Sequence, residues 1–191
     1  AGVVDGYDYE GGYKIKAVKD GTGKLLTYTI NQTMMRVELP QPLKTGQKFS
    51  FGVEWSYREY DRMKFNERGG YEYFPEDGNY LYACAQWYPR MCVFDDYEGW
   101  QNKQFLGNGE FTVPFGSFRV KITVPSDHIV GATGWLQNPK QVLSRDQQER
   151  FERARKTFDK QVFIVTEEEA RKKEKERSKK KSTWEFYADS V

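Results

Sequence analysis

The residues with the most evident capacity for chemistry lie in the stretch from Tyr80 to Glu110. Its first part, Tyr80 to Ala85, alternates like a strand, and the alternation stops at Gln86, shortly before Pro89. A glutamine at such a strand end can point its amide carbonyl into a cleft, where the oxygen accepts hydrogen bonds from an ammonium group. The simpler interpretation is that Gln86 only satisfies backbone groups of the Pro89 turn. The residues alone favour this simpler interpretation.

The same stretch carries charged residues that could pair with one another or hold a cation. Arg90 is followed by Asp95, Asp96 and Glu98. Carboxylate oxygens suit calcium, but these acids lack the regular spacing of a calcium loop. The guanidinium of Arg90 is a rigid fork that suits carboxylates, so we predict a structural ion pair of Arg90 with Asp95 and Asp96. We predict no metal site, because a histidine-rich site cannot be built from the single His128.

Motifs of the common catalytic centres are missing from the sequence. There is no H-E-x-x-H, no phosphate-binding glycine loop, no G-x-S-x-G and no CxxC. A lone histidine beside a strand, such as His128, is more often structural than catalytic. The two cysteines, Cys84 and Cys92, could form a disulfide across a turn or remain free buried thiols. We therefore predict no catalytic residue in this chain.

Composition sets the class of protein. The chain has 191 residues, a hydrophobic content of 38%, an aromatic content of 16% and a formal net charge of +2. Aromatic residues favour pleated surfaces, so the composition favours a mainly β fold. The near balance of charge predicts no nucleic-acid or membrane partner, and no apolar run is long enough to span a membrane. Because the first residue is Ala1, we expect a processed or shortened chain.

Alternating apolar residues predict most of the elements. They indicate a single β domain over residues 1–191, as an antiparallel β-sandwich. The expected strands are at 13–17, 26–30, 35–39, 49–57, 71–73, 80–85, 128–133, 162–165 and 183–188, with a hairpin of 111–115 and 118–124. Residues 58–70 are expected to form a loop.

One or two helices are expected in an insertion at about 140–182. Ser144 and Gln147 fit a capping box before an amphipathic helix over 145–158. Thr166 and Glu169 fit a second capping box. The charged run that follows mixes Glu with Lys and Arg and has almost no apolar residue, which favours a solvated helix over a nucleic-acid-binding tail.

Several motifs together resemble the bacterial zinc metallopeptidases of the gluzincin aminopeptidase family, which are related to aminopeptidase N and leukotriene hydrolase. The similar segments are Q-W-Y-P-R-M-x-V-x-D-D at Gln86–Asp96, G-W-x-x-x-Q-F-L-G-x-G-E-F at Gly99–Phe111, F-x-V-x-I-T-V-P-x-x-x-I-V-x-A-T-G at Phe118–Gly134, and L-Q-N-P at Leu136–Pro139. They occur in the family's order, and the resemblance covers most of the chain but none of the family's catalytic residues.

The resemblance implies a role for this chain. In that family the similar region is the non-catalytic N-terminal β domain, and a separate catalytic domain carries the zinc. The resemblance therefore implies a saddle-like sheet as the alternative to a β-sandwich. It thus implies a fragment of a larger peptidase, with zinc only in the missing catalytic domain, which would be the partner of this chain together with a peptide substrate. It also implies that Gln86 helps bind the substrate's free α-amino group. We expect a periplasmic or envelope-associated protein.

Exposed aromatic residues are expected under either of two functions. A domain that packs against a missing catalytic domain should show an apolar patch, for which Trp87, Tyr88, Trp100 and Phe105 are the candidates. The alternative function is a carbohydrate- or protein-binding β-sandwich module that uses Trp87, Trp100 and Tyr97 as stacking platforms.

Overall fold

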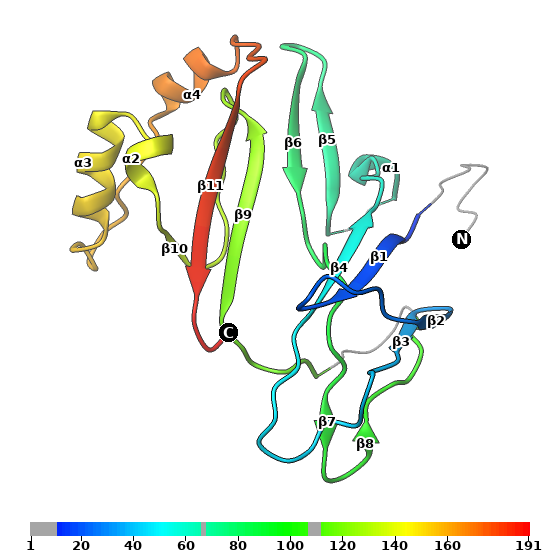
Figure 1. Cartoon of the computed structure of the whole chain (residues 1–191). Helices are drawn as coiled ribbons and strands as arrows, with labels where there is room; N and C mark the ends of the chain where they lie inside the picture. Colours follow the sequence, from blue (N-terminus) through cyan, green and yellow to red (C-terminus); the bar gives the residue numbers. More distant parts are fainter. Residues whose placement is uncertain (1–10, 66–67, 107–111) are drawn as a thin grey trace. The chain divides into compact units, whose positions relative to one another are not determined.

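The computed structural model describes residues 11–65, 68–106 and 112–191. Its chain divides into two compact units, the first of Ala1–Phe74 with Tyr80–Pro114 and the second of Pro75–Asn79 with Phe115–Val191 (Figure 1). The mainly β class is confirmed, since small antiparallel sheets dominate and the helices are short. The strands of the described residues form four two-stranded sheets and one three-stranded sheet instead of a continuous saddle.

The first unit is built from strand pairs. Its antiparallel pairs are β1 (Lys14–Asp20) with β4 (Phe51–Ser56), β2 (Tyr28–Asn31) with β3 (Met34–Val37), and β7 (Phe94–Asp95) with β8 (Gly99–Trp100). A further pair joins β5 (Gly70–Phe74) to β6 (Asn79–Ala83), whose first residue belongs to the second unit. The short helix α1 (Arg62–Phe65) lies where the sequence predicted a loop.

The buried part of the first unit is small. Val18 is 1% exposed and Leu26 is 7% exposed, and the Leu26 N–H donates to the Val18 carbonyl at 2.9 Å. The predicted turn after β1 forms because Asp20 Oδ1 accepts hydrogen bonds from Thr22 N at 2.9 Å and Lys24 N at 3.0 Å. This turn returns the chain toward β1 and brings Leu26 beside Val18.

The second unit is organised around β11 (Lys181–Ala188). It pairs with β9 (Phe118–Pro125) over its whole length and with β10 (Trp135–Leu136) on its other side. Side chains alternate between the two faces of the sheet along both long strands. Trp184 and Phe186 point to the buried face and are each 5% exposed, whereas Lys121 and Glu185 form an ion pair on the opposite face at 3.4 Å. The predicted strand over 183–188 is therefore present and central.

Three helices of the second unit lie within the region where the insertion was expected. They are α2 (Pro139–Val142), α3 (Arg145–Ala154) and α4 (Glu167–Lys173). Both predicted capping boxes are confirmed, at Ser144 with Gln147 and at Thr166 with Glu169. The helices are shorter than predicted, and in Figure 1 they lie on one side of the β9–β11 sheet. That side holds the core of Leu143, Trp184 and Phe186, against which Phe151 and Ile164 pack.

Three predicted strands are absent from the second unit or its border. Residues 112–117 are not a strand, so the expected hairpin of 111–115 with 118–124 does not form, and Phe111 lies outside the described residues. The segments 128–133 and 162–165 are not strands either. β9 pairs instead with β11, although the two are far apart in sequence. Ile164 instead packs against the core from an irregular segment.

Two polar side chains, those of Asn138 and Arg150, hold the helices of the second unit in place. The Asn138 amide donates from Nδ2 to the Thr183 carbonyl at 2.8 Å and accepts from Glu185 N at 2.9 Å, which ties the start of α2 to the β11 backbone. Arg150 of α3 donates from Nε to the Ile164 carbonyl at 2.8 Å and from Nη2 to Glu169 Oε1 at 2.6 Å. These contacts join α3 to the capped end of α4.

A glycine is required at position 134, directly before β10, because the backbone there lies very close to the backbone of β11. Its φ is +95°, and a Cβ atom placed there would meet the Tyr187 carbonyl oxygen at 2.3 Å. We expect Gly134→Ala to lower the free energy of unfolding by about 2 kcal/mol or more, because the alanine is strained and collides with backbone. Chemical denaturation measures this. The matched control Gly131→Ala, where a Cβ meets nothing within 4 Å, should change stability by less than about 0.5 kcal/mol. Equal effects of the two substitutions would contradict this account.

Because of Glu169, the stability of the second unit depends on pH in the acid range. The hydrogen bond from Arg150, followed by that from the Thr166 backbone, lowers the pKa of Glu169 from 4.5 to about 2. A carboxyl group whose pKa is lowered by folding stabilises the fold above pH 4.5, and this contribution is lost as the pH falls toward 2. We expect Glu169→Gln to destabilise the protein at pH 7 and to have little effect at pH 2, as measured by denaturation at both pH values. A destabilisation that is the same at both pH values would show that Glu169 acts without its charge.

Candidate functional site

Gln86 lies three residues beyond the end of β6, in the first unit, and its side chain is exposed. Its φ of +51° is in the left-handed region that a non-glycine residue seldom adopts. Its backbone carbonyl accepts a hydrogen bond from the Tyr13 hydroxyl, which holds the backbone in this conformation. Among the contacts of the described residues, the side-chain amide of Gln86 has no partner. The simpler interpretation requires a hydrogen bond between this amide and the backbone of the Pro89 turn, and none is found among the described residues.

Aromatic residues hold the backbone at Gln86 and at the next residue, Trp87. The Trp55 indole N–H donates to the Trp87 carbonyl at 3.2 Å, and the two rings lie 6.3 Å apart. The Tyr13 ring meets the Tyr57 ring edge to face at 5.8 Å. Because Trp55 is on β4 and Tyr13 directly precedes β1, the β1–β4 sheet fixes the position of Gln86.

A group of polar side chains lies next to Tyr13, in which Tyr57 and Glu59 are half-buried and Cys84 is exposed. The Tyr57 hydroxyl donates to Glu59 Oε1 at 2.5 Å, and Cys84 Sγ lies 3.5 Å from the same oxygen. Burial raises the pKa of the Tyr57 hydroxyl and of the Cys84 thiol, and the neighbouring Glu59 carboxylate raises both further. A thiol whose pKa is raised stays protonated at neutral pH and is a poor nucleophile. Cys84 and Cys92 are both free, so the disulfide that the sequence left open is not formed.

Asp95, one of the two acidic residues predicted to pair with Arg90, has other contacts. Asp95 accepts hydrogen bonds from Glu98 N at 2.8 Å and from Gln101 Nε2 at 2.9 Å. These bonds, that of Glu98 first, lower the pKa of Asp95. No ion pair links Arg90 to Asp95 or Asp96 among the described residues, and Arg90 and Asp96 are both exposed. Asp95 thus closes the β7–β8 turn, because backbone N–H groups two and three residues ahead are nearer than Arg90.

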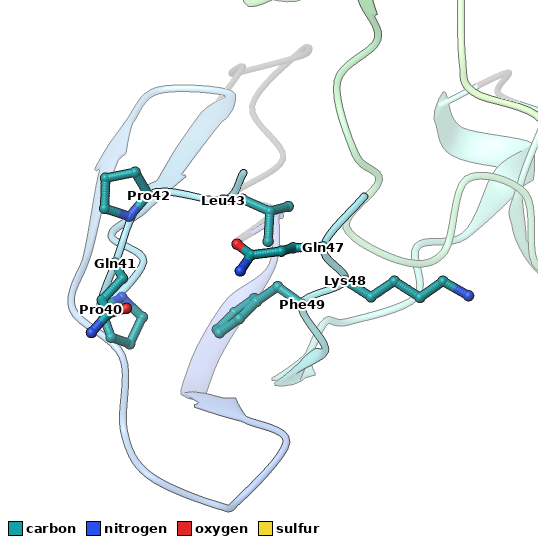
Figure 2. Close-up of a pocket in the computed structure, with 7 residues that line it drawn as sticks. All are labelled: Pro40, Gln41, Pro42, Leu43, Gln47, Lys48 and Phe49. Atoms are coloured by element: carbon teal, nitrogen blue, oxygen red, sulfur yellow. The ribbon is translucent and has the colours of Figure 1, made fainter. Parts of the chain in front are cut away.

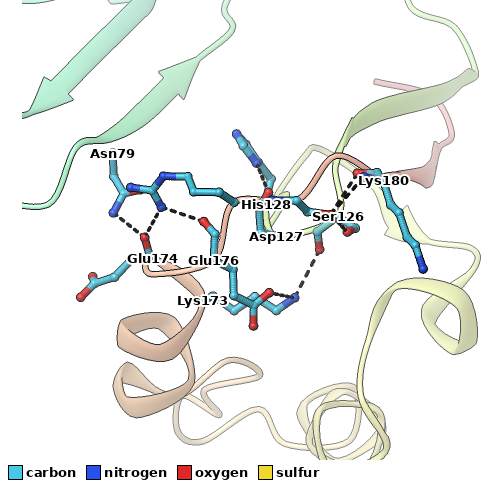
Figure 3. A network of polar contacts seen from close by, with 10 residues as sticks. Asn79, Ser126, Asp127, His128, Lys173, Glu174, Glu176 and Lys180 are labelled. Atoms are coloured by element: carbon cyan, nitrogen blue, oxygen red, sulfur yellow. Dashed lines mark hydrogen bonds and ion pairs between the residues drawn. The ribbon is translucent and has the colours of Figure 1, made fainter.

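His128 lies in the second unit and takes part in a network of polar contacts (Figure 3). Its Nδ1 lies 3.0 Å from Asp127 Oδ1, and the other oxygen of Asp127 accepts from Ser178 N at 2.7 Å. The bond from Ser178, followed by that from His128, lowers the pKa of Asp127. Lys173 Nζ donates to the Ser126 carbonyl at 3.2 Å. The network joins the end of β9 to the segment that leads into β11, which supports a structural role for His128.

The exposed aromatic surface differs from the predicted one. Trp87 contacts Trp55 and Tyr88, whereas Trp100, which is 55% exposed, packs against Phe94 at 5.2 Å. Phe105, which is 50% exposed, donates its backbone N–H to Thr33 Oγ1 at 2.9 Å. Trp100 and Phe105 are thus exposed as predicted, while Trp87 and Tyr88 are half-buried.

A second aromatic surface lies on the β5–β6 hairpin, and we call it the tyrosine face. It consists of Tyr71, Tyr73, Tyr80 and Tyr82, with the Tyr80 ring 4.8 Å from Tyr73, 5.8 Å from Tyr71 and 6.0 Å from Tyr82. Tyr73, Tyr80 and Tyr82 are each about half exposed. Sequence reasoning missed this surface, although period-two spacing in two runs separated by the turn at 76–79 predicts rings on one face of a hairpin.

The loop between β3 and β4 encloses a cavity of about 370 Å³ (Figure 2). Pro40, Pro42, Leu43 and Phe49 give it an apolar wall, and Gln47 closes the loop by accepting from Lys44 N at 2.9 Å. In Figure 2 the Lys48 side chain extends away from this group. The lining has no carboxylate, histidine, cysteine or serine, and Lys48 is its one ionisable residue.

Neither a metal centre nor a membrane-spanning helix is found in the part of the chain that the structure describes. No three His, Cys, Asp or Glu side chains lie close enough there to hold a metal ion. Likewise, none of its helices combines the length and the apolar character that crossing a membrane requires.

Comparison with protein-family models, with curated proteins and with solved structures finds no match to this chain.

Proposed function

We propose that this chain is the non-catalytic β domain of a zinc-dependent aminopeptidase, and that Gln86 binds the α-amino group of the peptide substrate. The observation that carries the proposal is that the Gln86 amide is exposed and unpartnered on a backbone that is held by other residues. The motif resemblance at Gln86–Asp96, Gly99–Phe111 and Phe118–Gly134 supports the class of enzyme.

The chemistry of amino-group recognition agrees with this placement. A substrate ammonium group carries three donors and needs oxygen acceptors in fixed positions. The amide oxygen of Gln86 is such an acceptor, and it adds no charge that would have to be desolvated. The Tyr13 hydroxyl and the Trp55 indole fix the carbonyls of Gln86 and Trp87 from the β1–β4 sheet. A side chain on a rigid support binds with a smaller loss of entropy than one on a mobile loop.

In this proposal the domain forms one wall of the active-site cleft. The zinc ion and the catalytic residues belong to a separate catalytic domain, which is the partner of this chain. Exposed rings such as Trp100, Phe105 and the tyrosine face supply apolar area for contact with that domain. We propose a periplasmic or envelope location, where peptides would reach the cleft.

The test is an aminopeptidase assay on the protein encoded by the reading frame that continues past Val191. That frame should encode an H-E-x-x-H helix. We expect Gln86→Ala to lower kcat/KM for peptides with a free N-terminus by about tenfold or more, because a hydrogen bond to a charged group is lost. Gln86→Glu should retain binding, since a carboxylate also accepts from ammonium.

The control for this assay is Gln41→Ala, which removes an exposed amide from the loop of 38–50. It should leave kcat/KM unchanged. The role of Gln86 is refuted if Gln86→Ala behaves like Gln41→Ala. The enzyme class is refuted if the continued reading frame encodes no zinc-binding helix.

The tyrosine face favours a second candidate function, carbohydrate binding. Aromatic rings stack on the apolar faces of sugars, and four adjacent tyrosines also present hydroxyl groups that can bond to sugar hydroxyls. Under this function the chain alone should bind immobilised glycans, and Tyr80→Ala should abolish binding because Tyr80 contacts the other three rings. Phe115→Ala, at a residue that is 87% exposed outside the tyrosine face, should not. A glycan array on which the unchanged chain binds nothing would remove this candidate.

A further inference from the structure

A second cavity, of about 430 Å³, lies in the second unit beside α3 and the segment that leads to α4. Its lining includes three cations, Arg150 and Arg153 from α3 and Lys160 from the following segment. No acidic side chain lines it. Every lining residue belongs to the second unit, whereas Gln86 belongs to the first.

The three cations differ in their partners. Arg150 is paired, since its Nη2 lies 2.6 Å from Glu169 Oε1 and its Nε donates to the Ile164 carbonyl. Arg153 and Lys160 are exposed, and neither makes an ion pair within the described residues. The cavity therefore holds two positive charges that no carboxylate of the described chain neutralises. Guanidinium and ammonium groups in such a position attract anions, and a guanidinium can bond two oxygens of one anion.

The support of this cavity is fixed by contacts that the two free cations do not make. Arg150 joins α3 to Ile164, and Thr166 caps α4 and donates its N–H to Glu169 Oε2 at 2.9 Å. The Thr157 hydroxyl donates to the Arg153 carbonyl at 2.8 Å, which closes the end of α3. Because these bonds use backbone groups and Arg150, the charged ends of Arg153 and Lys160 are left available for a ligand.

One wall of the cavity is apolar. Val162 and Phe163 line it, and Phe163 is 72% exposed. A large exposed ring beside unneutralised cations offers both parts of a site for an amphiphilic anion: a surface for stacking and charges for the anionic group.

We propose that this cavity binds a small organic phosphate, a phosphate monoester that carries an aromatic or apolar group. The two free charges of Arg153 and Lys160 match the charge of a monoester dianion, and the Phe163 ring covers its apolar part. Arg150 acts as a fixed support whose own charge is satisfied by Glu169.

The experiment is a titration of the ¹⁵N-labelled 191-residue chain with phenyl phosphate, followed by amide chemical shifts. Inorganic phosphate and phenol are titrated separately, so that the contributions of the phosphate group and of the ring to binding can be told apart. We expect saturable shifts at residues 150–166 with phenyl phosphate, weaker binding of inorganic phosphate, and weakest binding of phenol. Arg153→Glu and Lys160→Glu should each weaken phenyl phosphate binding by about tenfold or more, the change expected from losing one charge-assisted bond.

Two further variants test whether binding depends on the residues of this cavity. Phe163→Ala should weaken binding of phenyl phosphate and leave that of inorganic phosphate unchanged. Lys140→Glu makes the same change of charge on α2, outside the cavity, and should leave both unchanged. Circular dichroism verifies folding; if one charge reversal unfolds the chain, the other carries the test.

The proposal is overturned if phenyl phosphate gives no saturable shifts at 150–166. It is also overturned if Lys140→Glu weakens binding as much as the two reversals in the cavity, since that pattern is nonspecific attraction. Neither result bears on Gln86, whose assay measures peptide cleavage.

Discussion

The hydrogen bonding of β11 on both sides is the constraint on which the second unit depends. Eight residues of β11 pair with β9, and on the other side β10 and the Asn138 amide bond to its backbone. This position sends Trp184 and Phe186 into the core and makes them two of the most buried residues. The helices then cover that face, and Arg150 with Glu169 fixes α3 relative to α4. Replacing either ring by alanine in such a core typically costs about 3–5 kcal/mol.

The first unit is held in a different way. Few of its apolar side chains are fully buried, and its strands pair two by two. Beyond its strand pairs, single hydrogen bonds from aromatic side chains to the backbone join distant parts of the chain, such as Tyr13 to Gln86 and Trp55 to Trp87. A structure of this kind leaves many rings exposed, including Tyr73, Tyr80 and Trp100. Exposed aromatic area on this scale favours a domain that functions in contact with a partner or a ligand. Both candidate functions share this property, and they differ in what covers the rings.

The two proposed binding sites are built on the same physical principle. In each, the backbone is held by residues that do not take part in binding, so that the side chain intended for the ligand stays unpartnered. For Gln86 the support is Tyr13 and Trp55, and for Arg153 and Lys160 it is Arg150 with the capped end of α4. Asp95 shows the opposite case. Its carboxylate is already bonded to Glu98 N and Gln101, so it has little capacity left for Arg90 or for a cation.

The sequence by itself determined the local features of this protein. The mainly β class, both capping boxes and the β11 strand follow from composition and from patterns that span a few residues. Tertiary structure decided which strands pair and which charges meet. β9 pairs with β11 instead of with residues 112–115, and β11 carries the buried rings of Trp184 and Phe186. Likewise, Arg90 did not reach Asp95, and the tyrosine face appeared only when two short strands came together. Pairing and charge contacts depend on distances across the fold, and these are set by burial of the whole chain instead of by local spacing.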